Sequence, residues 1–205
     1  MKISCTAVGD FEANFYLVTD EMSKKGFAVD PGAEPERLIE IIRESGCDLK
    51  YIIITHAHAD HIGALDELKA AFNVPVVIGK DDADALNDSR KNLCDCFGMQ
   101  PPKTKADILA YDGFTLELGD EKIEFIETPG HTKGGICILT KDFVITGDTL
   151  FHLSVGRSDF DGGDQYELVS SIKNKLFKLF PTTRVYPGHG GATTILFESE
   201  HNPFV

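Results

Sequence analysis

The sequence lacks the features that would assign it to a membrane, secreted or nucleic-acid-binding class. It has no apolar run long enough to cross a membrane, and its first residues contain no apolar core of a signal peptide. Basic residues are few, since 20 Lys and Arg stand against 33 Asp and Glu, for a formal net charge of −13. Nucleic acids are bound through basic surfaces. We therefore expect a cytoplasmic protein without a membrane or nucleic-acid partner.

Cysteine is also scarce and irregularly spaced, which argues against a disulfide framework. The five thiols are Cys5, Cys47, Cys94, Cys96 and Cys137. The pair at 94 and 96 is a weak candidate metal site because no second pair lies nearby, and a loop or surface location for these thiols is the simpler interpretation.

The length and composition are those of one globular domain. A chain of 205 residues can bury a sizeable core but is short for two domains, and 42% apolar with 26% charged residues is ordinary. We expect a single domain over residues 1–205. Nothing in the sequence indicates the oligomeric state.

The apolar pattern divides the chain into two similar halves, each a strand meander followed by helix and strand. The first half predicts strands at 3–8, 14–19, 26–29, 51–54 and 74–78, and helices at 35–45, 64–72 and 81–86. The second predicts strands at 114–118, 122–127, 135–140, 143–146 and 184–186, and a helix at 164–180. Two sheets flanked by helices bury such elements best.

Residues 87–105 break this pattern with Asn, Ser, Gly and a Pro101-Pro102 pair. An irregular stretch of this length inside a domain is commonly functional. Two interpretations stay open, a loop over the mouth of a site and a surface insertion without a role.

The most informative stretch is Thr55-His-Ala-His-Ala-Asp-His61, directly after the buried strand 51–54. It gathers three imidazoles and one carboxylate at a strand-to-helix turn. Without a ligand such a cluster would carry a desolvation cost and, at low pH, repulsion between imidazolium groups. The stretch therefore predicts a metal site with more than one metal.

Three other strand ends carry a ligand-type residue among Gly and Pro, namely His131 in Thr-Pro-Gly-His, Asp148 in Thr-Gly-Asp and His189 in Pro-Gly-His. With the first stretch they give five His and two Asp. A catalytic zinc takes three protein ligands, so seven suit two metals about 3.5–4 Å apart that share a carboxylate. Nitrogen and oxygen donors accept zinc, iron or manganese.

These motifs resemble those of the metallo-β-lactamase superfamily over essentially the whole chain. The finer patterns at 147–151 (Gly-Asp-Thr-Leu-Phe), 155–159 (Val-Gly-Arg-Ser-Asp) and 187–190 (Pro-Gly-His-Gly) are similar to the glyoxalase II (hydroxyacylglutathione hydrolase) branch, in its short single-domain bacterial type. The resemblance implies an α/β fold, the αββα sandwich of two mixed sheets flanked by helices, with metals at one edge.

The resemblance also implies ligand roles, for two divalent ions, with zinc as the first expectation and iron or manganese as alternatives. The first metal would be held by His56, His58 and His131 and the second by Asp60, His61 and His189. Asp148 would bridge them and Arg157 would bind substrate.

Departures from the family pattern concern substrate choice. Because only a short tail follows His189, we expect no C-terminal glutathione-binding helical domain, and Asp159 stands where the branch has Tyr. Arg157 could pair with a substrate carboxylate, or locally with Asp159 or Asp161. Asp148 disfavours β-lactamase activity, because those enzymes typically carry Cys there. His152 and His201 are expected on the surface.

The resemblance implies a metal-dependent hydrolase, a thioesterase acting on small hydroxyacyl-thiol esters through a hydroxide that bridges the metals, with Asp60 and Asp148 as catalytic residues. A thiolate leaves without protonation, so no separate general acid is required. The alternative is a persulfide dioxygenase with one iron on His56 or His58, His131 and Asp148. The motif at Gly156–Phe160 fits this dioxygenase alternative, whereas the motif at 187–190 fits the hydrolases with two metals better. A non-catalytic metal-binding protein would be expected to lack some ligands.

Overall fold

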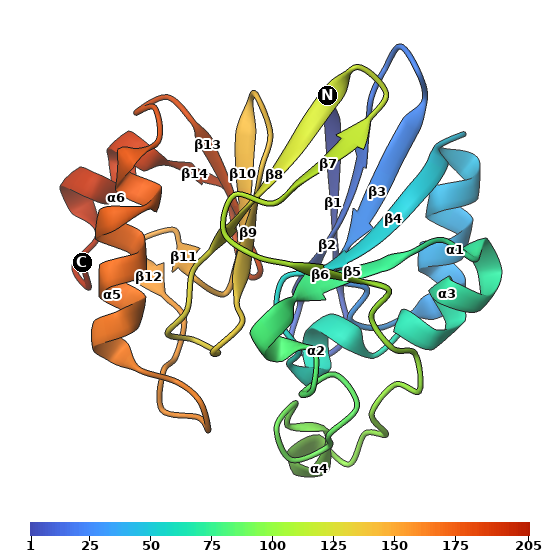
Figure 1. Cartoon of the computed structure of the whole chain (residues 1–205), viewed down its shortest axis with the longest axis horizontal. Coiled ribbons are helices and arrows are strands. Elements are labelled where there is room, and N and C mark those ends of the chain that lie inside the picture. Colours follow the sequence, from blue (N-terminus) through green and yellow to red (C-terminus); the bar gives the residue numbers. More distant parts are fainter.

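Two six-stranded sheets stack face to face, and helices cover the outer side of each (Figure 1). The computed structural model describes residues 1–205. Helices α1 (Pro35–Glu44) and α3 (Leu65–Phe72) cover one side, and α5 (Gln165–Asn174) and α6 (Ile195–His201) cover the other. This is the αββα sandwich that the sequence predicts. None of the helices has the length and apolar character required to span a membrane.

The first sheet has the strand order β1-β2-β3-β4-β5-β6. Its first three strands form an antiparallel meander, and β4, β5 and β6 then continue parallel to β3. The bounds are Lys2–Val8, Ala13–Thr19, Lys25–Val29, Asp48–Ile54, Val76–Gly79 and Ile108–Ala110.

The second sheet has the order β14-β13-β10-β9-β8-β7, antiparallel except for the parallel pair β10 and β13. The bounds from β7 to β10 are Thr115–Leu118, Glu121–Glu127, Ile136–Leu139 and Phe143–Gly147, and those of β13 and β14 are Arg184–Pro187 and Thr193–Thr194. A small hairpin, β11 (Leu150–Phe151) and β12 (Ser154–Val155), leads to α5.

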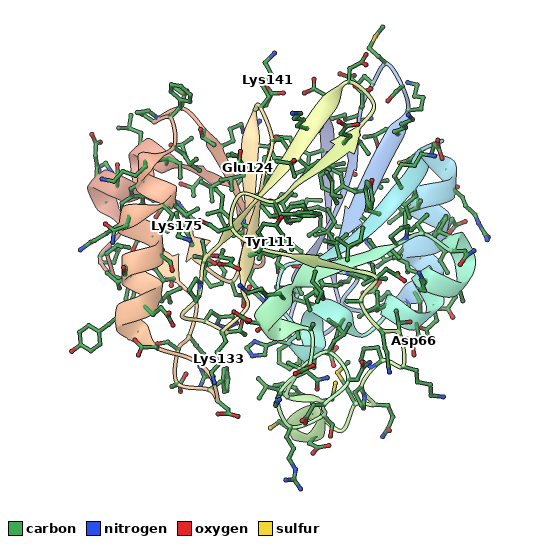
Figure 2. The ribbon with its side chains drawn as sticks, viewed as in Figure 1. Asp66, Tyr111, Glu124, Lys133, Lys141 and Lys175 are labelled. Atoms are coloured by element: carbon green, nitrogen blue, oxygen red, sulfur yellow. The ribbon has the colours of Figure 1, made fainter.

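Apolar residues fill three layers, one between the sheets and one under each helical layer. Strand β4 shows why its sequence is a continuous apolar run. Ile53 faces the other sheet, whereas Ile52 and Ile54 face α1 and α3, because successive side chains point to opposite sides of a strand. Side chains fill the space between the sheets, and Lys141 projects from the rim (Figure 2). The layers give the strand ends a rigid frame.

Two predicted helices are wrong in extent, and a third, confirmed as α3, has a short helix before it. The segment 81–86 forms only a 3-10 turn, Lys80–Asp82, followed by turns; Asp residues favour such local structure over helix. The helix predicted over 164–180 starts after the N-cap Asp164 but ends at Asn174, and a 3-10 turn then keeps Leu176 buried. The helix predicted at 64–72 is preceded by a separate short helix, α2 (Ala59–Ile62).

The sequence analysis also missed short elements, namely β6, the β11–β12 hairpin, β14, α4 (Cys94–Phe97) and α6. Elements of two to seven residues present too few periods for a pattern to be recognised. Helix α6 does carry a local signal, because the Thr194 side chain accepts a hydrogen bond from the Phe197 amide as an N-cap.

We predict that Ile53→Ala lowers the free energy of unfolding by about 2–5 kcal/mol, the usual cost of truncating a fully buried Ile. Ile53 is 0% exposed between the sheets. Urea denaturation followed by circular dichroism measures the change. The control Leu109→Ala, at a side chain that is 49% exposed on β6, should change it by less than about 0.5 kcal/mol. Equal stability of the two variants would contradict the packing described.

Candidate metal centre

The seven predicted residues come from four chain segments and meet at one edge of the sandwich. Each segment follows the C-terminal end of a strand: residues 56–61 follow β4, His131 follows β8, Asp148 follows β10, and His189 follows β13. Because β4 belongs to the first sheet and the other three to the second, the segments converge where the two sheets meet.

Three imidazoles form the first group. The rings of His56, His58 and His131 are buried, with centroids 4.6–4.7 Å apart. One nitrogen from each lies within 4.8 Å of the others, close enough to hold one ion. His56 and His58 point into the same space although both lie beyond the end of β4.

Asp60, His61 and His189 form the second group. The Asp60 carboxylate oxygen Oδ2 lies 3.2 Å from His189 Nε2 and 3.5 Å from His61 Nε2. Asp60 and His61 belong to α2, which begins at the turn, so the two residues are presented from a short helix.

Asp148 lies between the two groups. Its Oδ1 is 3.5 Å from His61 Nε2, and its Oδ2 is 3.7 Å from both His131 Nε2 and His189 Nε2. One carboxylate thus reaches nitrogens of the first and second groups. This is the position that a bridging ligand requires.

The donor atoms fit a metal because they have no other partner. The buried polar atoms without a hydrogen bond are Nε2 of His56, His58, His61 and His131, and Oδ1 of Asp148. Buried polar groups are normally paired, and an unpaired one costs about 1–3 kcal/mol. Five such atoms directed into one place indicate that a cation belongs there.

Four of the five opposite ring nitrogens are held by the protein. The Nδ1 atoms bond to the Thr55 hydroxyl (from His56, 3.1 Å), to Asp30 Oδ2 (from His61, 3.0 Å), to the Arg157 carbonyl (from His131) and to the Phe11 carbonyl (from His189, 3.1 Å). A proton on Nδ1 leaves the Nε2 lone pair free for a metal, and the bond fixes the ring.

The charges of the cluster differ between its two groups. Burial, reinforced by neighbouring imidazoles, lowers the pKa of His58 to about 3 and that of His56 well below its usual value. Burial also opposes charge on His61, but Asp60, Asp148 and Asp30 outweigh it and raise its pKa to about 10. His56 and His58 are therefore neutral, whereas the carboxylates around His61 favour its protonated form when no metal is bound.

Asp30 is a supporting residue that the sequence analysis missed. It lies near His56 and His61, but its carboxylate oxygens already accept hydrogen bonds from the Thr55 amide (2.7 Å) and hydroxyl (2.6 Å) and from His61 Nδ1. It contacts His61 from behind, away from Nε2, so it orients that ligand. Its only sequence signal is an Asp at the end of a strand.

Asp82 is a second missed residue, assigned from sequence to an acidic helix. Its buried carboxylate accepts hydrogen bonds from the Thr132 hydroxyl (2.8 Å), the Gly134 amide (2.7 Å) and the Ala57 amide (3.3 Å). Burial raises the pKa of Asp82, although these hydrogen bonds act to lower it. Asp82 therefore ties the segment carrying His56 and His58 to the loop carrying His131.

Residues 87–105 pack beside the centre. The Asn92 carbonyl accepts a hydrogen bond from the Ala59 amide (2.8 Å), and Phe97 and Met99 line a cavity that Asp60 also lines. The geometry thus agrees with a loop at the mouth of the site. Of the two thiols expected in a loop or at the surface, Cys96 is exposed, whereas Cys94 is buried, and burial raises its pKa to about 11.

The Arg157 side chain adopts the local alternative, with two bonds to Asp159 (2.9 and 2.8 Å) and its guanidinium 4.3 Å from the Phe160 ring centroid. Its substrate-binding role stays a prediction. His152 bonds to Glu198 (3.3 Å), and His201 is exposed; neither belongs to the two groups.

We predict that Asp82→Asn lowers the free energy of unfolding by about 1–3 kcal/mol, because an amide cannot accept all the bonds of the carboxylate. It should also weaken metal binding by about 10–100-fold, as loss of residues supporting ligands does. Thermal unfolding and competition with a chelating dye measure the two effects. The neighbouring exposed Asp84→Asn is the control. Identical behaviour of the two variants would refute the role of Asp82.

Known proteins are similar to this chain over most or all of its length. The family model described as "Metallo-beta-lactamase superfamily" matches residues 8–189. The chain is 36% identical to the Bacillus subtilis protein "Probable metallo-hydrolase YqgX", covering 100% of this chain and 98% of the relative. It is also 36% identical to "Hydroxyacylglutathione hydrolase GloC" of Haemophilus influenzae, covering 100% and 98%.

Solved structures show the same architecture. The "BLEG-1 B3 metallo-beta-lactamase" superposes with a TM-score of 0.93 at 33% identity, covering 99% of each chain. TTHA1623 "in a di-iron-bound form" gives 0.88 at 33%, covering 98% of this chain and 100% of that one. ETHE1 from Myxococcus xanthus gives 0.84 at 29%, covering 99% and 84%. The chain belongs to the metallo-β-lactamase superfamily, a superfamily of metal-binding hydrolases.

Proposed function

We propose that the protein is a thioesterase of glyoxalase II type, which hydrolyses small hydroxyacyl-thiol esters with two divalent metal ions. The observation that carries the proposal is the position of Asp148 between two complete groups of three donors. The full-length similarity to a hydroxyacylglutathione hydrolase supports the choice of substrate class.

The metal ions, when bound, would polarise the thioester carbonyl and bring the pKa of a coordinated water toward neutrality. His56, His58 and His131 would hold the first ion and Asp60, His61 and His189 the second. Asp148 sets the distance between the two groups. Asp60 would accept a hydrogen bond from the attacking water and orient it, since its carboxylate is 19% exposed and lines the cavity beside the centre.

A thioester suits this site because of its leaving group. A thiolate departs as a stable anion, so the chain need not supply a general acid beside the bond that breaks. An amide or a sugar would require one.

Zinc is our first proposal for both positions, with iron or manganese as alternatives. Five imidazoles and two carboxylates, with no thiolate among them, accept all three metals. A similar protein has been crystallised in a di-iron-bound form.

The direct test gives metal-loaded protein two substrates, S-lactoylglutathione and glutathione persulfide. We expect hydrolysis of the thioester, which is measured by the thiol that it releases. We expect no oxygen uptake with the persulfide. Oxygen uptake without thioester hydrolysis would replace the proposal with the persulfide dioxygenase alternative.

We predict that Asp148→Ala reduces thioester hydrolysis by more than about 100-fold and lowers the metal content. The loss should exceed the about 10–100-fold that is typical when a residue supporting a metal ligand is removed, because Asp148 is a ligand itself. The fold should be retained, because the change removes a buried oxygen that has no hydrogen-bond partner. Steady-state kinetics and elemental analysis measure the effects. The exposed Asp120→Ala in the β7–β8 turn is the control. Normal turnover of Asp148→Ala would refute the bridging role.

A further inference from the structure

A cavity of about 450 Å³ opens beside Asp60, on the side of the second group. This volume lies in the range of about 300–1,000 Å³ typical of small-molecule sites. More than half of its nine lining residues are apolar; they are Val8, Phe11, Ala33, Phe97 and Met99. We call it the apolar cavity.

The apolar cavity is built around two aromatic rings from distant parts of the chain. Phe11, in the turn between β1 and β2, and Phe97, at the end of α4, meet edge to face with centroids 4.7 Å apart. They remain 48% and 44% exposed. Large apolar side chains left open to solvent beside a polar site are typical of a binding surface.

The backbone behind these rings is connected to the metal centre. The carbonyl of Phe11 accepts the hydrogen bond from His189 Nδ1, and the carbonyl of Asn92, on the segment before α4, accepts one from the Ala59 amide. Met99 lies against Gly63, where a Cβ would come within 2.9 Å of its terminal methyl group. The cavity walls are therefore fixed relative to Asp60.

The opposite side of the centre is different. A smaller cavity of about 140 Å³ beside His58 and Thr132 is lined mainly by charged residues, namely Asp81, Asp82, Asp84, Lys91, Lys133 and Asp161. Lys133 of this smaller cavity is labelled in the lower half of Figure 2. The centre thus has a charged side and an apolar side.

We propose that the apolar cavity binds the acyl group of the substrate, and that this group carries an apolar chain or ring beyond the hydroxyl-bearing carbon. The proposal rests on the proposed thioesterase function. The carbonyl carbon of a thioester has two arms. A peptide thiol carries charges of both signs, which the carboxylates and ammonium groups of the charged side can pair with, so the acyl arm is assigned to Phe11, Phe97 and Met99.

The expected preference follows from apolar burial. Each methylene group that becomes fully buried gains about 0.8 kcal/mol, or about fourfold in affinity. A lactoyl group offers one methyl, whereas a 2-hydroxyhexanoyl group adds three methylenes. Because the cavity is open on one side, the three methylenes are only partly buried. We therefore expect about a tenfold gain in kcat/KM, less than three fourfold gains multiplied together.

The experiment uses the metal-loaded protein and one carrier, glutathione, with three acyl groups: lactoyl, 2-hydroxyhexanoyl and mandeloyl. The wild type should prefer the two larger groups over lactoyl by about tenfold in kcat/KM. Phe97→Ala should reduce that ratio to about threefold or less. Phe180→Ala, at a side chain that is 82% exposed elsewhere, is the matched control and should keep the wild-type ratio.

A binding measurement separates this proposal from the proposed function. Calorimetry compares 2-hydroxyhexanoate with lactate on the metal-loaded wild type and on Phe97→Ala. Tighter binding of the longer acid that is lost in Phe97→Ala would support the cavity even if no thioester is hydrolysed. Thioester hydrolysis with equal kcat/KM for all three acyl groups, or equal or undetectable binding of the two acids, would overturn the cavity and leave the thioesterase intact.

Discussion

Five polar atoms without a hydrogen-bond partner lie buried at the edge where the two sheets meet, and the surrounding structure keeps them in that state. A protein that buries unpaired imidazole nitrogens loses stability unless a cation compensates. The Nδ1 bonds to Thr55, Asp30 and two backbone carbonyls prevent four of the five rings from turning away. The cluster is therefore preorganised for metal before any ion arrives.

Backbone segments approach one another closely around the cluster, and this brings the metal-ligating side chains together. The carboxylate of Asp148 fits only because position 188 is glycine, where a Cβ would come within 2.1 Å of its Oδ1. Gly147, which precedes Asp148, has a positive φ of 47°, and a Cβ there would lie 2.4 Å from the Thr55 hydroxyl. Glycines next to ligands thus bring the ends of strands from both sheets to within bonding distance of one site.

The sequence predicted the fold class and the meeting of the seven residues, because both follow from local signals. An imidazole or carboxylate directly after an apolar strand is visible in a few residues, and parallel strand ends share an edge. Asp30 and Asp82 were missed because their roles depend on partners up to 52 positions away, such as Gly134. The apolar cavity depends likewise on Phe11 meeting Phe97, which no local pattern predicts.

The central claim is that this edge holds two metal ions, divided between the two groups of donors and joined by Asp148. Elemental analysis of the purified protein, loaded with metal and then freed of excess ions, tests it most directly. The account predicts two divalent ions per chain. A single ion per chain at saturation, such as one iron, would contradict it.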